Sequence, residues 1–120
     1  MYGLDKNVKL DFLVGNELTQ VSVGAYQVIL RLAGDIEISI EGRCDLTDDD
    51  GTTTQIHAKS PQDTARLSVL VKSTVSNVTN RGDGSVQLAF SNGYSLLITD
   101  SNKNFESYQI SRPSNDAIVV

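Results

Sequence analysis

The sequence predicts an α+β fold in which a unit of one helix and a three-stranded antiparallel meander occurs twice. The apolar pattern of residues 10–41 recurs in residues 67–99, 57 to 58 positions later, and a repeated apolar pattern indicates a repeated supersecondary unit. Both segments also alternate apolar and polar residues around glycine-containing turns, as antiparallel hairpins do. We expect the two units to be related by a pseudo-twofold axis and to form one compact, mostly β domain over residues 1–120.

The first unit is predicted to start with a short helical turn and to continue as a meander. Two alternating runs flank Gly34–Asp35, a turn dipeptide that favours a hairpin with one buried face. The other face of this hairpin is polar and acidic, as in a sheet that is wetted on one side. The predicted elements are a helical turn at 8–14 with Leu10, Leu13 and Val14 inward, and strands at 19–23, 26–32 and 36–40.

The second unit carries clearer helix signals. Ser60 is a favourable N-cap, Pro61 suits the first helical position, and Asp63 meets the positive end of the helix dipole. The β-branched residues that follow indicate that this helix ends near Ser73. Asn92–Gly93 between alternating runs is a strong hairpin signal. The predicted strands are 75–79, 86–90 and 94–98, with further short strands at 53–57, 106–110 and 117–120.

The composition is that of a globular protein, with 39% hydrophobic and 21% charged residues in 120. A single cysteine, Cys44, excludes an internal disulfide and is typical of a reducing compartment. The N-terminus lacks the pattern of a signal peptide, and the apolar runs are much shorter than a membrane-spanning helix requires. We therefore expect a cytoplasmic protein with no membrane partner.

The negative charge is concentrated in one segment. Residues 35–51 hold seven acidic residues and one arginine, a net charge of −6 in a chain whose total is −5. This excess argues against a nucleic-acid partner, because phosphates attract a basic face. The segment is either a solvated hairpin or a face that binds a basic protein. The candidate partner-binding residues are Glu37, Glu41, Asp45, Asp48, Asp49 and Asp50.

Three aromatic residues form a second candidate site. The alternation of the strands assigns Tyr26, Phe90 and Tyr94 to the inner faces, where they either pack in the core or line a small-molecule pocket between the two repeats.

No catalytic or metal-ligating motif is complete. His57 has no nucleophile beside it in a known motif, and the acidic residues near Cys44 disfavour a reactive thiolate. The segment 100–111 begins like a calcium loop but lacks the required glycine and the final glutamate. Nothing fixes the carboxylates of 48–50 into a coordination shell. We therefore expect no enzyme activity, no cofactor and no metal.

Several segments resemble an uncharacterised bacterial family of small proteins that is known only as a domain of unknown function. The resemblance covers nearly the whole chain, and one departure from it is the interruption of the C-terminal hairpin at 112–115. It implies a stand-alone cytosolic protein without an established activity, and some members lie in toxin–immunity loci. The segments that carry it are MYGL, FLVGNELTQVSVGAYQVIL, ISIEG, FSNGYSLLITD and FESYQI.

These observations lead to two functional hypotheses. The first is a non-enzymatic cytosolic interaction protein, specifically an immunity protein that neutralises a basic bacterial toxin through an acidic face. The alternative is a small-molecule-binding or sensing domain. The oligomeric state stays open.

Overall fold

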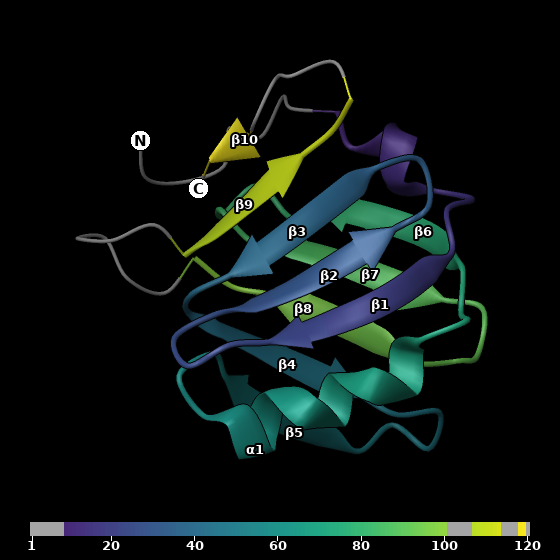
Figure 1. The fold of residues 1–120 in the computed structure, drawn as a ribbon. Coiled ribbons are helices and arrows are strands. Elements are labelled where there is room, and N and C mark those ends of the chain that lie inside the picture. Colours follow the sequence, from purple (N-terminus) through teal and green to yellow (C-terminus); the bar gives the residue numbers. More distant parts are fainter. Residues whose placement is uncertain (1–8, 101–106, 114–117, 120) are drawn as a thin grey trace.

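A computed structural model describes residues 9–100, 107–113 and 118–119 of the chain as two five-stranded antiparallel sheets (Figure 1). The two sheets lie face to face as the layers of a sandwich. The first sheet has the order β1 (Leu18–Val23), β2 (Val28–Leu32), β3 (Ile36–Ile40), β9 (Tyr108–Ser111) and β10 (Ile118–Val119). The second has the order β5 (Thr53–His57), β4 (Arg43–Thr47), β8 (Ser95–Ile98), β7 (Val86–Phe90) and β6 (Val75–Asn80).

The predicted α+β class is wrong, because the described residues form two antiparallel sheets with a single short α-helix and are not built from two helix-plus-three-strand repeats. Within the described residues the only α-helix is α1 (Pro61–Thr64), which continues as the 3₁₀ helix η2 (Ala65–Leu70). The expected N-terminal helical turn is the single 3₁₀ turn η1 (Asp11–Leu13). No helix of the described part of the chain has the length and apolarity to cross a membrane.

Both helical segments are short because the backbone leaves the helical region directly after them. Val14 and Val71 are extended, with ψ values of 135° and 136°. The residues that follow, Gly15 and Lys72, have positive φ angles of 88° and 77°. A positive φ cannot continue a right-handed helix, so the predicted extension to Ser73 does not form.

The three strands of each predicted meander are neighbours in one sheet, but each meander is followed by two strands that join the opposite sheet. After β3 the chain crosses to the second sheet, where β4 pairs with β8. After β8 it returns to the first sheet, where β9 pairs with β3. Strand β4 is absent from the elements that the sequence predicts. Its alternation is nevertheless regular, with Cys44 and Leu46 buried between half-buried polar neighbours.

The core fills the space between the inner faces of the two sheets. Strands β2, β3 and β7 each alternate buried and half-buried residues from end to end. Each fully buried aliphatic side chain contributes about 1.5–3 kcal/mol to the free energy of unfolding. The largest fully buried side chains include Tyr108, Leu13, Leu18, Leu30, Ile38, Ile40, Ile56, Leu67, Leu70, Leu88, Leu96 and Ile98.

Backbone hydrogen bonds join the two sheets along one side of the sandwich. An isolated antiparallel bridge connects Glu17 to Thr74. Two hydrogen bonds of 2.8 Å flank it, from the N–H of Gly15 to the carbonyl of Val75 and from the N–H of Lys72 to the carbonyl of Leu18. Strands β1 and β6 also carry a register shift at matching positions. Their adjoining ends are therefore paired with each other.

Individual strands were predicted better than the fold. The hairpin around Gly34–Asp35 is confirmed as β2 and β3, and β5 has the predicted bounds. Two side chains are not inward as predicted: Tyr26 is 74% exposed and Val14 is 42% exposed. Tyr26 lies in the bend before β2, where strand alternation does not yet apply. The segments 1–8, 101–106 and 114–117 and residue 120, which include parts of the predicted terminal elements, lie outside the described residues.

Candidate functional site

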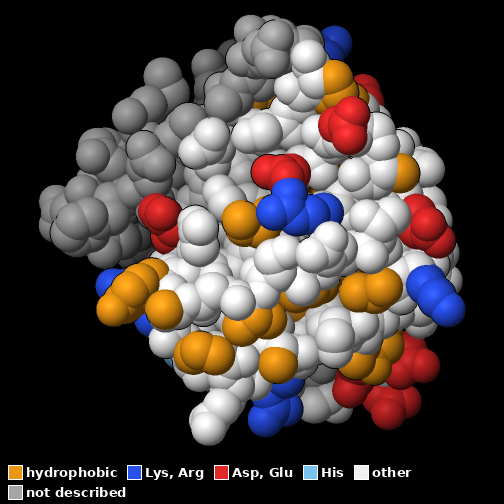
Figure 2. Space-filling view, viewed as in Figure 1, with side chains coloured by type: hydrophobic (Ala, Val, Ile, Leu, Met, Phe, Trp, Pro, Cys, Tyr) orange, Lys and Arg blue, Asp and Glu red, His pale blue; other side chains and the backbone are white. Residues whose placement is uncertain are grey.

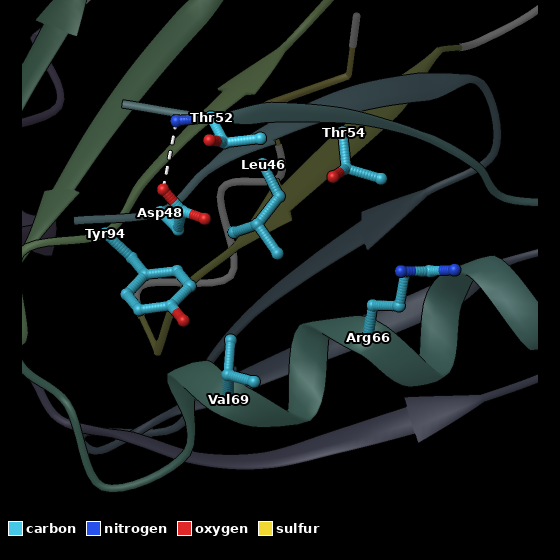
Figure 3. Close-up of a pocket in the computed structure, with 7 residues that line it drawn as sticks. All are labelled: Leu46, Asp48, Thr52, Thr54, Arg66, Val69 and Tyr94. Atoms are coloured by element: carbon cyan, nitrogen blue, oxygen red, sulfur yellow. Dashed lines mark hydrogen bonds between the residues drawn. The ribbon is translucent and has the colours of Figure 1, made fainter. Parts of the chain in front are cut away.

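A groove of about 230 Å³ opens between the tip of the β4–β5 hairpin and η2 (Figure 3). The sheet side is formed by the ends of β4 and β5 and by the turn before β8, and the other side by the helix. The lining residues are Leu46, Asp48, Thr52, Thr54, Arg66, Val69 and Tyr94.

The floor of the groove is apolar and continues the core outward. Leu46 is 7% exposed, whereas Val69 on η2 is 45% exposed. In Figure 3 the Tyr94 ring and Val69 lie close together on one side of the groove, with Leu46 above them. Leu46 pairs with Thr54 across the hairpin. The side chains on the inner face of the second sheet therefore change from apolar to polar at its edge strand.

The rim carries groups of both charges. Asp48 and the hydroxyls of Thr52 and Thr54 lie on the sheet side, and Arg66 projects from the helix at some distance from Asp48. No side chain of the described residues forms an ion pair with Arg66. The groove therefore offers an apolar centre between an acidic end and a basic end.

The acidic end is held by a tight turn. One carboxylate oxygen of Asp48 accepts hydrogen bonds from the backbone N–H groups of Asp50 and Thr52, each at 2.9 Å. Gly51 completes the turn with a φ of 89°, a conformation that favours glycine. Carboxylate oxygens of Asp48, Asp49 and Asp50 all lie within 4.8 Å of one another. The turn thus concentrates three negative charges in one place.

Two neighbouring turns support this arrangement. A Cβ atom on Gly93 would lie 3.1 Å from the Cβ of Asp49, so the β7–β8 turn packs closely against the acidic turn. The side-chain amide of Asn92 donates to the carbonyl of Val69 at 3.2 Å. Its backbone N–H donates to the Ser73 hydroxyl, also at 3.2 Å. These contacts fix the position of Val69 relative to Tyr94.

The predicted acidic residues do not share one face. Asp48, Asp49 and Asp50 lie together, and acidic side chains gather in Figure 2 where Figure 1 places the β4–β5 turn. Glu37 lies on the outer face of the first sheet and forms an ion pair with Arg31. Asp45 lies on the outer face of the second sheet, 3.6 Å from Arg43.

Glu41 is also separate from the acidic turn. It follows β3 and lines a polar hollow of about 70 Å³ together with Gln27, Ser39, Tyr108 and Gln109.

Of the three predicted aromatic residues, Tyr94 alone lines the groove. Tyr26 is exposed in its bend and Phe90 is 4% exposed in the core. The predicted site residues do not include five others that line the groove: Leu46, Thr52, Thr54, Arg66 and Val69. Arg66 and Val69 are three positions apart on the predicted helix and so lie on one face of it. Because β4 was not predicted, the sequence could not show that this face lies opposite the β4–β5 hairpin.

The groups with a shifted pKa lie away from the groove lining. Burial, followed by the charge of Asp45, raises the pKa of the Cys44 thiol to about 12, so the reactive thiolate is suppressed. Burial also raises the pKa of Tyr108, whose hydroxyl donates to the carbonyl of Gly84 at 2.8 Å. Hydrogen bonds from Ser85 lower the pKa of Asp83 in the β6–β7 turn. His57 lies on the edge strand, where its backbone N–H donates to Asp63 at 3.2 Å.

The acidic turn is the only group of metal-ligating side chains that the described residues bring together. Asp49 and Asp50 are exposed, and one Asp48 oxygen already accepts two backbone hydrogen bonds. These features suit a charged surface better than a closed oxygen shell.

Comparison with known proteins places the chain in a family. No curated protein matches the sequence. No solved structure matches it either. The family model described as a family of unknown function, DUF6188, matches residues 10–120. The chain, in which each sheet combines strands from both halves of the sequence and the β4–β5 turn is acidic, therefore belongs to the DUF6188 family.

Proposed function

We propose that this protein is a non-enzymatic binding protein that engages a basic protein through the turn Asp48–Asp50 and the adjoining groove. The observation that carries the proposal is the packing of three carboxylates within 4.8 Å of one another beside an apolar floor. Two like charges about 4 Å apart repel by about 1 kcal/mol in water. A lysine or arginine placed between them converts this repulsion into attraction, and its aliphatic stem can cover the apolar floor.

The size of the groove favours a side chain of a partner over a free ligand. Its volume of about 230 Å³ lies below the range of about 300–1,000 Å³ that is usual for small-molecule pockets. Val69 is also too exposed to form a closed wall, at 45%. A partner surface that inserts one or two side chains would complete the enclosure.

The partner class that we favour is a basic toxin, which this protein would neutralise. Proteins that act on nucleic acids carry basic faces, and an acidic inhibitor gains association rate against such a face. The sequence resembles a family of which some members lie in toxin–immunity loci, and this agrees with the choice. The proposal includes a cytoplasmic location, where an immunity protein would meet such a toxin.

Two charge-matched variants test the proposal. D48N/D49N/D50N removes the acidic turn, and D11N/D35N/E37Q removes three carboxylates elsewhere, so both change the net charge from −5 to −2. The partner is captured from the native cells with the wild-type protein and purified, and its association rate is measured at about 50 and about 300 mM salt, where screening differs strongly. We expect the first variant to associate about tenfold more slowly at low salt and with a weaker salt dependence.

The control variant should keep most of the rate and of the salt dependence. Equal losses in both variants would show that net charge, and not the turn, attracts the partner. An unchanged rate in D48N/D49N/D50N would remove the proposal. Rescue of growth when the protein is co-expressed with the captured partner would test the toxin assignment separately.

A second candidate function is small-molecule binding in the same groove. The combination of an apolar floor with hydroxyl groups and charges of both signs at the rim favours it. A thermal-shift screen of metabolites tests it, since a ligand raises the melting temperature through its binding free energy. The shift should disappear in Tyr94→Ala and persist in Tyr26→Ala, because Tyr26 does not line the groove.

A further inference from the structure

Strand β5 is an edge of the second sheet, and alternate residues direct their backbone groups away from β4. In an antiparallel ladder every second pair exchanges hydrogen bonds. The N–H of Asp48 donates to the carbonyl of Thr52 at 2.9 Å, and the N–H of Ala58 donates to that of Gly42 at 2.9 Å. Even-numbered residues of β5 therefore bond to β4. The N–H and C=O groups of the odd-numbered residues Thr53, Gln55 and His57 point outward.

Only one end of this edge is closed. The N–H of His57 donates to the Asp63 carboxylate at 3.2 Å. Its carbonyl accepts from the N–H of Ser60 at 3.0 Å. No hydrogen bond from the described residues reaches the outward backbone groups of Thr53 or Gln55. The N–H and C=O groups of these two residues are thus available beside the acidic turn.

The edge strands β1 and β6 are protected, whereas β5 is not. β1 and β6 both carry a register shift, and their ends are joined through the bridge between Glu17 and Thr74. β5 pairs with β4 without a shift, and its sequence TTQIH has neither the lysine nor the proline that commonly blunts an edge. Such an edge is a template for an added strand.

We infer that β5 accepts an extended, basic segment of a partner protein as an added antiparallel strand, with backbone bonds to Thr53 and Gln55 and basic side chains on Asp48–Asp50. This inference rests on the proposed function, for which it supplies the mode of binding. The charge of the turn selects the occupant: a second copy of this chain would bring another acidic turn and a net charge of −5, whereas a basic segment is attracted.

The location of the acidic turn determines which end of an antiparallel added strand carries the basic residues. The turn precedes Thr53, so it lies at the N-terminal end of β5. An antiparallel partner runs in the opposite direction and reaches this turn with its C-terminal part. A residue advances about 3.4 Å along an antiparallel strand, so basic residues two or three positions after the one opposite Thr53 lie beside the carboxylates.

The groove supplies contacts for side chains of the added strand. Thr54 faces inward with its partner Leu46 and lines the groove. The residue of the added strand that lies opposite Thr54 points to the same face of the sheet. A β-branched apolar residue at that position would continue the inner face of the sheet beyond Thr54, on the side of the groove that faces Val69.

Two peptides of equal composition test this arrangement. Acetyl-Thr-Val-Thr-Val-Lys-Lys-amide has its lysines at the predicted end, and acetyl-Lys-Lys-Thr-Val-Thr-Val-amide has them at the opposite end. Titration of each peptide into the intact protein is followed by NMR and by calorimetry. We expect the first peptide to bind about tenfold more tightly. We also expect it to slow hydrogen exchange of the Thr53 and Gln55 amides.

Blocking the backbone distinguishes strand addition from charge attraction alone. N-methylation of the two threonines in the first peptide should weaken binding about tenfold or more, whereas N-methylation of its two valines should have little effect. Gln55→Pro removes an outward N–H that the sheet does not use and should weaken binding similarly, while Gln55→Ala should not. The methylated peptides give the answer even if Gln55→Pro does not fold.

Each outcome decides between the two proposals. Binding that is lost in D48N/D49N/D50N but is indifferent to N-methylation would overturn strand addition and leave the proposed function standing. Equal binding of the two peptides would overturn the antiparallel arrangement, and no binding of either would overturn the basic segment as occupant. Protection of Thr53 and Gln55 without peptide, together with a dimeric mass by ultracentrifugation, would show that a second copy occupies the edge.

Discussion

The carboxylate of Asp63, in the first turn of α1, accepts a hydrogen bond of 3.2 Å from the backbone N–H of His57, the last residue of β5. This bond ends the open edge of the second sheet at a defined residue. It also anchors the helix that forms one wall of the groove. The same contact therefore limits where a partner strand can pair with β5 and positions the helix residues that the side chains of that strand would contact.

Removing this contact should loosen both elements. We expect Asp63→Ala to lower the free energy of unfolding by about 1 kcal/mol, the usual net value of one hydrogen bond, and to accelerate hydrogen exchange of the His57 amide. Asp63→Asn keeps an acceptor oxygen and should restore most of the loss. Urea unfolding and NMR exchange measure the two effects. Equal exchange rates in all three proteins would contradict this role.

Two glycines allow the support of the acidic turn to be measured. Gly51 and Gly93 have similar φ angles of 89° and 91°, so alanine costs about 1–2 kcal/mol at either position. An added Cβ meets nothing within 4 Å at Gly51 but lies 3.1 Å from the Asp49 Cβ at Gly93. Gly93→Ala should therefore be the more destabilising substitution by urea unfolding. The reverse order would show that the two turns do not pack as described.

The buried thiol of Cys44 predicts a loss of stability at alkaline pH. Its pKa is raised from 9.0 to about 12 in the folded state, so between these values the unfolded state loses its proton first. Stability is then fully present below pH 9 and falls as the pH rises toward 12, by up to about 1.4 kcal/mol per pH unit for one proton. In Cys44→Ala the free energy of unfolding, measured in urea across this range, should fall less steeply. Parallel pH profiles would contradict the prediction.

Substitutions at two adjacent residues of η2 should affect the free energy of unfolding and partner binding separately. Leu70 is fully buried, whereas Val69 is 45% exposed. Leu70→Ala should lower the free energy of unfolding by about 2–5 kcal/mol. Val69→Ala should change it by less than about 0.5 kcal/mol. Val69→Ala should nevertheless weaken partner binding, because its side chain lines the groove. A large stability loss in Val69→Ala would show that the groove belongs to the core.

Local patterns in the sequence predicted strands because strand alternation is a local property. The run around Gly34–Asp35 has its turn and both buried faces within 15 residues, and it forms as expected. Val86–Phe90 has the same regularity and is also a strand. The prediction failed for β4, where three aspartates and a glycine after Leu46 resemble a loop although Cys44 and Leu46 alternate inward.

The arrangement of the strands could not be obtained in the same way. Alternation shows that Glu37 and Asp45 both point outward, but it does not show which sheet each belongs to. The structure assigns them to different sheets, so the predicted acidic face divides and only its 48–50 part stays together. The groove was missed for the same reason, because it needs β4, β5 and η2 to be placed relative to one another.

The exchange of strands between the sheets has a consequence for folding during synthesis. Ile38 in the first sheet pairs with Ile110, so a layer begun by the earliest strands gains β9 only after the whole second sheet has been made. Pairings so distant in sequence form slowly, and until then β3 presents an unpaired edge to the cell. A nascent chain of this protein therefore has an incomplete first sheet during most of its synthesis. It is most exposed to aggregation in the interval before residue 110 emerges.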